Sequence, residues 1–280
     1  MTRDTRVEGH SGHAEDKTAE LPVRGPGWDP WRGLTAHTPA RIGLGRAGAA
    51  ARTEVHLAFQ AAHAAARDAV HVPWDLEALR AELDGVVVAS RAGSRQEYLL
   101  RPDLGRQLAE ANHADLAALR RDLATPWDVV LVLSNGLSTE GLQRHGAGLT
   151  RELLAAFAAS ELEVAPVVLV PDARVALGDP IGAQVGARAV VIVVGERPGL
   201  SASDSLGIYL TLLTETGGGL TDADRNCISN VHPPAGLDYA QAAAKCAWLL
   251  NEALRRGYSG VRLKDESPNG LTLVRSLEEA

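Results

Sequence analysis

The sequence predicts an α/β fold, and three short apolar runs carry this prediction. They lie at 128–134, 164–171 and 189–195 and read DVVLVLS, VAPVVLVP and AVVIVVG. Strands that are buried on both faces have such continuous apolar sequences. Helical stretches separate the runs, and strands that alternate with helices favour right-handed βαβ crossovers. We therefore expect a Rossmann-like parallel sheet flanked by helices, preceded by a smaller helical N-terminal region.

The N-terminal part is expected to be mainly helical after a flexible tail. Residues 1–28 are too polar to bury enough apolar surface to offset the entropy of ordering. In residues 29–97, apolar positions recur with helical spacing among polar ones. In chain order we expect a helix at 53–70, a helix at 74–83, a strand at 85–89 and, just beyond this region, a helix from Pro102 to about Asp122.

The remaining residues, 98–280, are expected to form the Rossmann-like domain. Helices are predicted at about 148–160 and at 181–186, a further strand at 208–214 and a long helix at 239–256. A parallel sheet usually binds its ligands beyond the carboxyl ends of its strands. The candidate binding loops are therefore 134–141, 171–182, 195–207 and 222–240.

Composition and charge exclude several classes of function. The chain has 280 residues, 45 % of them hydrophobic, and its formal net charge of -7 gives no basic field to attract nucleic acid or anionic lipid. No apolar run approaches the roughly 20 residues that span a bilayer, and the N-terminus lacks the apolar core of a secretory signal. Only two cysteines occur. We expect a cytoplasmic protein with neither a membrane nor a nucleic-acid partner.

Three glycines raise the question of a nucleotide. Gly43, Gly45 and Gly48 fall on the GxGxxG spacing of dinucleotide-binding proteins. A fingerprint of this kind follows a buried strand and is matched by an acid at the end of the next strand. Here the preceding run contains Pro39 and is not apolar, and the acid near the required spacing, Asp68, lies inside a predicted helix. A glycine-rich turn into a helix is the better interpretation, and a nucleotide-dependent oxidoreductase is the alternative.

Other catalytic motifs are absent from the sequence. HExxH, CxxC, GxSxG and GxxxxGK[ST] do not occur, which removes the sequence basis for zinc hydrolysis, thiol redox chemistry, a serine hydrolase elbow and a P-loop. His56 and His63 lie seven residues apart in one predicted helix, but no third ligand accompanies them. We expect no metal site, and no motif here marks a catalytic acid, base or nucleophile.

The candidate loops contain groups with two possible roles. Glu196 and Arg197 follow the third apolar run directly; they can pair, or Glu196 can accept hydrogen bonds from an amide-bearing ligand. Arg174 and Val175 would lie over a strand edge, in what spacing alone describes as a plain loop. Cys227 is expected to be a small buried hydrophobe, as free cysteines usually are.

Taken together, five segments resemble the small (light) subunit of ethanolamine ammonia-lyase, an adenosylcobalamin-dependent lyase that converts ethanolamine to acetaldehyde and ammonia. GERPGL and RNCISN, at this separation and in this order, are the most specific part of the resemblance. The glycines at 43–48 then belong to the family's own N-terminal segment. The matching segments are ARIGLGRAGAAART at 40–53, YLLRPDLGR at 98–106, SNGLSTEG at 134–141, VGERPGLSASDSLGIYLT at 194–211 and DADRNCISN at 222–230.

The resemblance implies a division of labour between two chains. A larger TIM-barrel subunit would hold the ethanolamine, and this chain would cover one side of the cobalamin. The chain would be active only with the large subunit, and the two are expected to form an oligomer of heterodimers. The family's cofactor contacts fall on Val175, Glu196 and Cys227. A corrin ring is apolar and edged with amides, so an aliphatic contact, a hydrogen-bond acceptor and a small side chain suit it.

Two departures from the family pattern and one alternative accompany this prediction. Asn135 stands where members commonly have aspartate, and residues 214–222 form a stretch about one residue longer. In some relatives an N-terminal extension is linked to packaging in a bacterial microcompartment, but this tail shows no clear amphipathic helix. The alternative function is a non-catalytic assembly or scaffold module of an ethanolamine-utilisation complex.

Overall fold

The computed structural model describes residues 31–38, 40–121, 125–213 and 219–268. The tail predicted at 1–28 lies outside these residues, as does most of the stretch at 214–222. Contacts within the chain define two compact units, Met1–His56 and Leu57–Ala280. Each unit is described by itself below.

The first unit contains the glycine-rich segment. Gly43, Gly45 and Gly48 have φ angles of 61°, 70° and 62°, a region that side chains other than glycine rarely adopt. Ahead of them lies a short 3-10 helix, η1 (Arg32–Ala36), and the described part of this unit contains no strand before Gly43. The segment is a set of turns that leads to helix α1 (Thr53–His71), as predicted, and it lacks the strand of a dinucleotide fingerprint.

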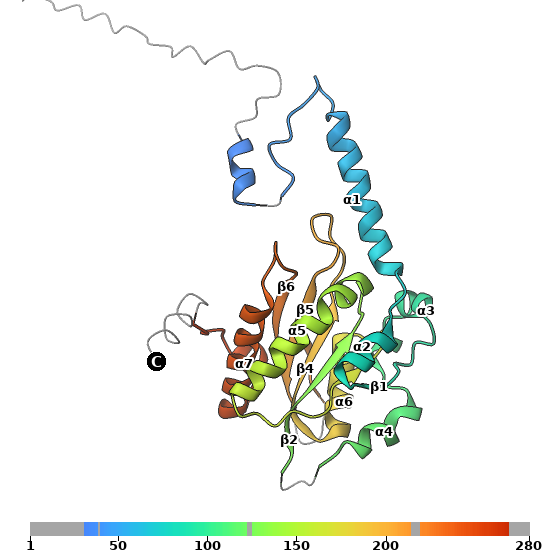
Figure 1. Ribbon diagram of the computed structural model, residues 1–280, viewed down its shortest axis with the longest axis vertical. Coiled ribbons are helices and arrows are strands. Elements are labelled where there is room, and N and C mark those ends of the chain that lie inside the picture. Colours follow the sequence, from blue (N-terminus) through green and yellow to red (C-terminus); the bar gives the residue numbers. More distant parts are fainter. Residues whose placement is uncertain (1–30, 39, 122–124, 214–218, 269–280) are drawn as a thin grey trace, which may run out of the picture. The chain divides into compact units, whose positions relative to one another are not determined.

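The second unit is built on a mixed sheet. Its described residues form six strands in the order β1-β3-β2-β4-β5-β6 (Figure 1). The pairs β1 with β3, β3 with β2 and β2 with β4 are parallel, whereas β5 runs antiparallel to both β4 and β6. The strands are β1 (Val86–Val87), β2 (Trp127–Ser134), β3 (Val168–Leu169), β4 (Ala187–Gly195), β5 (Leu206–Leu212) and β6 (Arg225–Val231).

The prediction of a wholly parallel sheet is therefore wrong for its last two strands. A parallel connection needs a crossover of a dozen or more residues, usually through a helix. The segment 196–205 between β4 and β5 is shorter and contains no helix, so β5 returns antiparallel. Residues 225–231, expected in a loop, form β6 instead. Ile228 and Val231 are buried whereas Cys227, Ser229 and Asn230 are exposed, as in an antiparallel strand with one face open.

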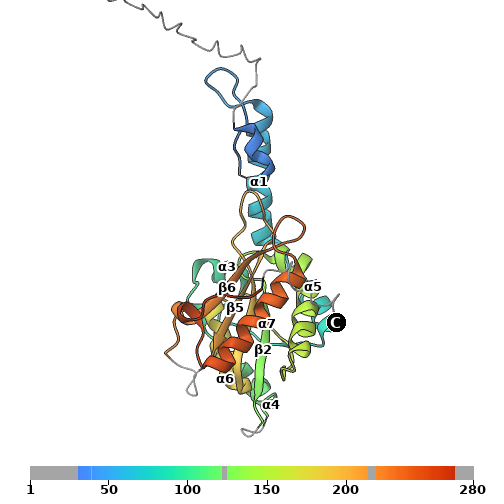
Figure 2. The same ribbon diagram turned by 90° about the vertical axis from the view of Figure 1, so that its left-hand side faces the viewer.

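Helices cover both faces of the sheet (Figure 2). Helices α5 (Thr139–Ala159) and α7 (Tyr239–Arg256) pack side by side on one face, together with α2 (Leu76–Leu83). The opposite face carries α6 (Gly178–Val185) and α4 (His113–Ala118). Side chains of β2 alternate between the two cores, Leu131 and Leu133 toward α5, Val130 and Val132 toward α6.

Most predicted elements are present, with different bounds. The helix at 239–256 has the predicted limits, whereas α5 begins nine residues earlier than the predicted 148, at Thr139, because Ser138 caps it by accepting a hydrogen bond from the Gly141 N–H (3.0 Å). The run 164–171 forms only the two-residue strand β3 and a single parallel bridge from Val164 to Val129. The strand at 86–87 pairs with β3 at the edge of the sheet.

The helix predicted over 102–122 is wrong. Helix α3 (Arg95–Leu100) ends before Pro102, and two 3-10 turns separate it from α4. A Cβ on Gly105 would lie 2.7 Å from the Tyr98 ring, so the chain passes too close to this ring for an ordinary side chain. The two turns are η2 (Leu104–Arg106) and η3 (Glu110–Asn112).

Candidate functional site

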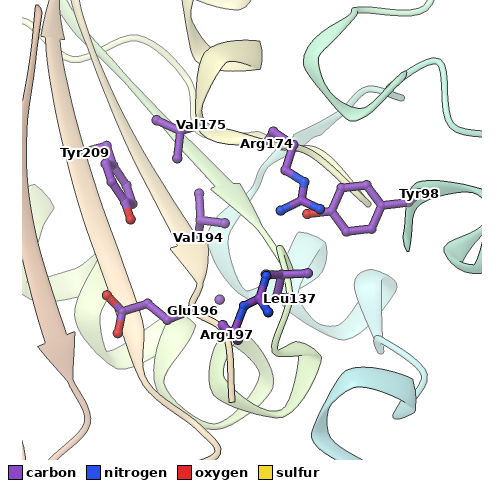
Figure 3. A pocket seen from close by; sticks show the side chains of 9 residues that line it. Tyr98, Leu137, Arg174, Val175, Val194, Glu196, Arg197 and Tyr209 are labelled. Carbon is purple, nitrogen blue, oxygen red and sulfur yellow. The ribbon is translucent and has the colours of Figure 1, made fainter. Parts of the chain in front are cut away.

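Two adjoining hollows lie on the α6 side of the sheet. Their volumes are about 430 Å³ and about 310 Å³, and they share Arg174, Val175 and Tyr209. Figure 3 shows the first hollow. The first is also lined by Tyr98, Leu137, Val194, Gly195, Glu196 and Arg197, and the second by Arg106, Ala176, Asp222, Arg225 and Cys227.

Strand pairing explains why these side chains meet. Tyr209 of β5 lies opposite Ile192 of β4 and opposite Cys227 of β6, so the three project from one face. Helix α6 and the 3-10 turn η4 (Val175–Leu177) cover this face over β4 and bury Ile192. Over β5 and β6 the covering ends, which leaves Tyr209 half-buried and Cys227 exposed. The hollows are therefore the uncovered part of a sheet face.

Glu196 is held at the wall of the first hollow. Its Oε2 accepts hydrogen bonds from the Ser205 hydroxyl (2.7 Å) and from the Asn230 main-chain N–H (3.3 Å). A Cβ on Gly207 would lie 2.9 Å from the other carboxylate oxygen, so only glycine leaves that oxygen its place. Among the described residues Glu196 makes no ion pair with Arg197. The carboxylate is thus a fixed acceptor at the hollow and not half of a local pair.

The loop that carries Glu196 is anchored on α5 and α7. His145 is buried, its Nε2 donates to the Asp204 carboxylate (3.2 Å), and its Nδ1 accepts from the Tyr239 hydroxyl (2.7 Å). The Ser138 hydroxyl donates to the main-chain oxygen of Ser203 (2.7 Å). Burial lowers the pKa of His145, although Asp204 partly opposes this effect. A neutral imidazole therefore fixes the end of the loop next to Ser205.

Tyr209 contributes a neutral phenol to both hollows. Burial raises the pKa of its hydroxyl, and the neighbouring Cys227 and Glu196 raise it further. In Figure 3 the Tyr209 ring stands on the same side of Val194 as Glu196, with Tyr98 and Arg174 on the other side. The surface therefore combines an aromatic ring, aliphatic side chains and a few polar groups.

The loop at 134–141 uses its polar groups within the fold. The Ser134 hydroxyl accepts hydrogen bonds from the main-chain N–H groups of Gly136 (3.3 Å) and Ala173 (3.0 Å). Asn135 is bonded to Asp172, and Ser138 caps α5. Of this loop only Leu137 lines a hollow. Its polar side chains are therefore bonded within the fold, and ligand contact by this loop, which the sequence left open, stays a prediction.

The structure brings the three predicted site residues to one surface. Val175 lines both hollows, Glu196 the first and Cys227 the second. The expectation that Cys227 is buried is wrong, because it lies on the open face of β6; Cys246 is the buried cysteine, and burial raises its pKa to about 12. Binding of a cofactor by these residues stays a prediction.

Tyr209 and Arg174 are among the lining residues that the sequence does not assign to a site. Tyr209 lies in an apolar strand and was assigned only to the sheet; its half-open position depends on where α6 ends. Arg174 was recognised as lying over a strand edge, but not as part of a pocket. A single signal was available, since an isolated tyrosine interrupts the aliphatic run of that strand.

In the part of the chain that the structure describes, no cluster of three or more His, Cys, Asp or Glu side chains could hold a metal ion. No helix within the same residues is long and apolar enough to cross a membrane.

Comparison with known proteins decides the family. Residues 28–264 match the family described as ethanolamine ammonia-lyase light chain. The chain belongs to this family. Similar curated proteins, each named ethanolamine ammonia-lyase small subunit, come from Rhodococcus erythropolis (49% identical, covering 85% of this chain and 91% of the relative), Azotobacter vinelandii (50%, 85% and 89%) and Bradyrhizobium diazoefficiens (48%, 85% and 91%).

Membership of the light-chain family agrees with the resemblance seen in the sequence. The matched range contains all three predicted contact residues and both hollows. The family and relatives are named for one subunit of a lyase, and a small subunit implies a larger partner. An open, half-covered surface suits a chain of this kind, because a partner can supply the missing side.

Proposed function

We propose that this chain is the small subunit of an ethanolamine ammonia-lyase, and that the surface of the two hollows covers one side of adenosylcobalamin beside the large subunit. One observation carries the proposal. Val175, Glu196 and Cys227 come from three separate segments of a light-chain family member, and they line one continuous surface.

The residues present fit a corrinoid. A corrin presents a broad apolar ring edged with amide side chains, so its site needs apolar surface with a few well-placed polar groups. Val175, Val194 and the Tyr209 ring supply the apolar part. Glu196, already fixed by Ser205, supplies an acceptor for an amide N–H.

The chemistry divides between cofactor and protein. When bound, adenosylcobalamin supplies the radical that starts hydrogen abstraction from ethanolamine, on the way to acetaldehyde and ammonia. We assign binding and shielding to this chain. Glu196 and Tyr209 orient the amide edge through hydrogen bonds, while Val175 excludes water from the ring. We assign no proton transfer to any residue of this chain.

The partner and the location complete the proposal. We infer a TIM-barrel large subunit that makes most of the contacts to ethanolamine. We also infer an assembly of several heterodimers and a cytoplasmic enzyme. Sedimentation of the assembled complex would measure the number of heterodimers. Co-sedimentation with shell proteins from the native host would show instead that the enzyme is packaged in a microcompartment.

One assay tests the function directly. Acetaldehyde release is measured from ethanolamine and adenosylcobalamin with this chain alone, with the large subunit alone and with both. We expect turnover only in the mixture. Absence of turnover in the mixture, with both chains folded and the cofactor intact, would contradict the proposal and favour the scaffold alternative.

A further inference from the structure

Arg174 carries a charge for which the described residues supply no counterion. Its guanidinium lies over the Tyr98 ring, 4.7 Å from the ring centre, and its Nε is buried without a hydrogen-bond partner. The side chain is half-buried and lines both hollows. An unpaired cation that is partly removed from water costs free energy, so this arrangement is suited to a ligand that supplies the missing acceptor.

Arg95 also lies against the Tyr98 ring, but its guanidinium has acceptors within the fold. Arg95 lies 5.2 Å from the centre of the Tyr98 ring, and it donates to the Asp172 carboxylate (2.7 Å) and to the Gly136 main-chain oxygen (2.5 Å). Arg95 is therefore satisfied within the fold. Arg174 has no comparable acid in the described chain, although its main chain is fixed by a hydrogen bond to the Gly105 oxygen (2.8 Å).

The charges around the hollows favour an anion. Arg225 is neutralised by a two-point contact with Asp179 (2.7 and 2.8 Å). Arg106 and Arg197, both exposed, join Arg174 in having no ion pair among the described residues. In all, four arginines line the hollows against two carboxylates, Glu196 and Asp222, on a chain whose net charge is -7, so this surface is a local exception to the acidic whole.

Guanidinium groups bind phosphate particularly well. The planar fork donates two hydrogen bonds to two phosphate oxygens, and a charged acceptor strengthens both. The neutral amide side chains of a corrin would leave the charge of Arg174 uncompensated. Among the side chains of cobalamin, the phosphodiester of the nucleotide loop is the anionic group.

We propose that Arg174 binds the phosphodiester of the cobalamin nucleotide loop. The inference rests on the proposed function, since it assigns one more contact of the same surface. Stacking on Tyr98 holds the guanidinium at the junction of the two hollows. Arg106 and Arg197 attract the same anion from the rim.

The test compares two ligands on the assembled complex of small and large subunits. Adenosylcobalamin carries the phosphodiester, whereas adenosylcobinamide lacks the nucleotide loop and therefore the group. Equilibrium binding is measured by visible absorption for the parent and for Arg174→Met, with Arg174→Lys as the variant that keeps the charge. The matched control is Arg101→Met, which removes an exposed arginine that pairs with Asp103 outside the hollows.

The expected result is a ligand-specific loss. Arg174→Met should weaken adenosylcobalamin binding about ten- to a hundredfold, as expected for a charge-assisted hydrogen bond, and leave adenosylcobinamide binding unchanged. Arg174→Lys should fall between the parent and Arg174→Met. The control should bind both ligands as the parent does.

Four outcomes would overturn the inference. An equal loss for both ligands would mean that Arg174 contacts the corrin side or only shapes the hollow. Loss of assembly with the large subunit in the absence of any corrinoid would mean that a carboxylate of the partner occupies the guanidinium. If the parent complex binds neither corrinoid, the proposed function fails as well. If the parent binds adenosylcobalamin tightly and Arg174→Met leaves this binding unchanged, only the inference about Arg174 is refuted.

Discussion

Asn135, which stands where the family resemblance leads us to expect aspartate, is joined to Asp172 by two hydrogen bonds. The side chain is buried, its carbonyl oxygen accepts from the Asp172 main-chain N–H (2.7 Å), and its amide donates to the Asp172 carboxylate (3.2 Å). Replacement by aspartate keeps the acceptor, removes the donor and brings a second carboxylate oxygen to the first. Asn135→Asp therefore tests the local electrostatics with almost no change in shape.

The expected loss of stability follows from the distance between the two side chains and from the cost of protonating one carboxylate. Two unit charges at the 3.2 Å separation of Asn135 Nδ2 and Asp172 Oδ1 repel by about 5 kcal/mol at an effective dielectric constant of about 20. Binding a proton avoids this repulsion, and at pH 7 it costs about 4 kcal/mol for a carboxyl of ordinary pKa, about 3.9. Arg95, 2.7 Å from the Asp172 carboxylate, offsets part of either cost. We expect Asn135→Asp to lower the free energy of unfolding by about 2–4 kcal/mol at pH 7.

The pH dependence separates this cause from a simple loss of packing. In the variant the folded carboxyl pair has a raised pKa, so it binds more protons than the unfolded chain. The penalty is therefore smallest below the unfolded pKa and grows as the pH rises through the folded pKa. Urea unfolding followed by circular dichroism at about pH 5 and about pH 8 measures it.

Asn135→Ser is the control, because it removes both hydrogen bonds without adding a charge. Its penalty should be nearly the same at both pH values. A variant Asn135→Asp as stable as the parent, or one whose penalty does not change with pH, would refute the electrostatic explanation.

Three further predictions concern other parts of the fold. Asp179→Asn should lower the free energy of unfolding by about 3–5 kcal/mol, measured by urea unfolding, because it leaves Arg225, 5% exposed, without its main counterion. Burial lowers the pKa of His145 below its ordinary 6.5. The neutral imidazole therefore contributes its full stabilisation above pH 6.5, and this contribution is lost as the pH falls through the folded pKa. Thermal unfolding across this range measures the loss. A thiol reagent should modify the exposed Cys227 in the native protein while Cys246 stays protected, as followed by mass spectrometry of peptides.

Each of these predictions has its own control. Asp222→Asn removes the other, exposed partner of Arg225 and should cost no more than about 1 kcal/mol; equal losses for both aspartates would contradict the assignment. His145→Gln cannot take up a proton, and an unchanged pH profile in this variant would assign the loss to another group. If corrinoid covers Cys227 as proposed, adenosylcobalamin should slow its modification in the assembled complex, and an unaltered rate would count against that contact.

The local pattern of the sequence determined the elements that bury one or both faces. The apolar runs of β2 and β4 and the spacing in α1 and α7 suffice to predict these elements, because side-chain periodicity follows directly from helix and strand geometry. The family resemblance also predicted contacts at Val175 and Glu196, and the structure places both residues in the wall of a hollow. These features depend on residues close together in the chain.

The tertiary structure decided strand direction and partnership. The antiparallel β5 follows from a connection without a helix and from pairing on both sides, neither of which a single strand's sequence records. The open side of Cys227 depends on where α6 ends, and the pairing of Asn135 with Asp172 joins residues 37 positions apart. Among the described residues Arg174 lacks a counterion because none of its neighbours in space supplies one. Such contacts arise when distant segments pack together, so periodicity and spacing do not encode them.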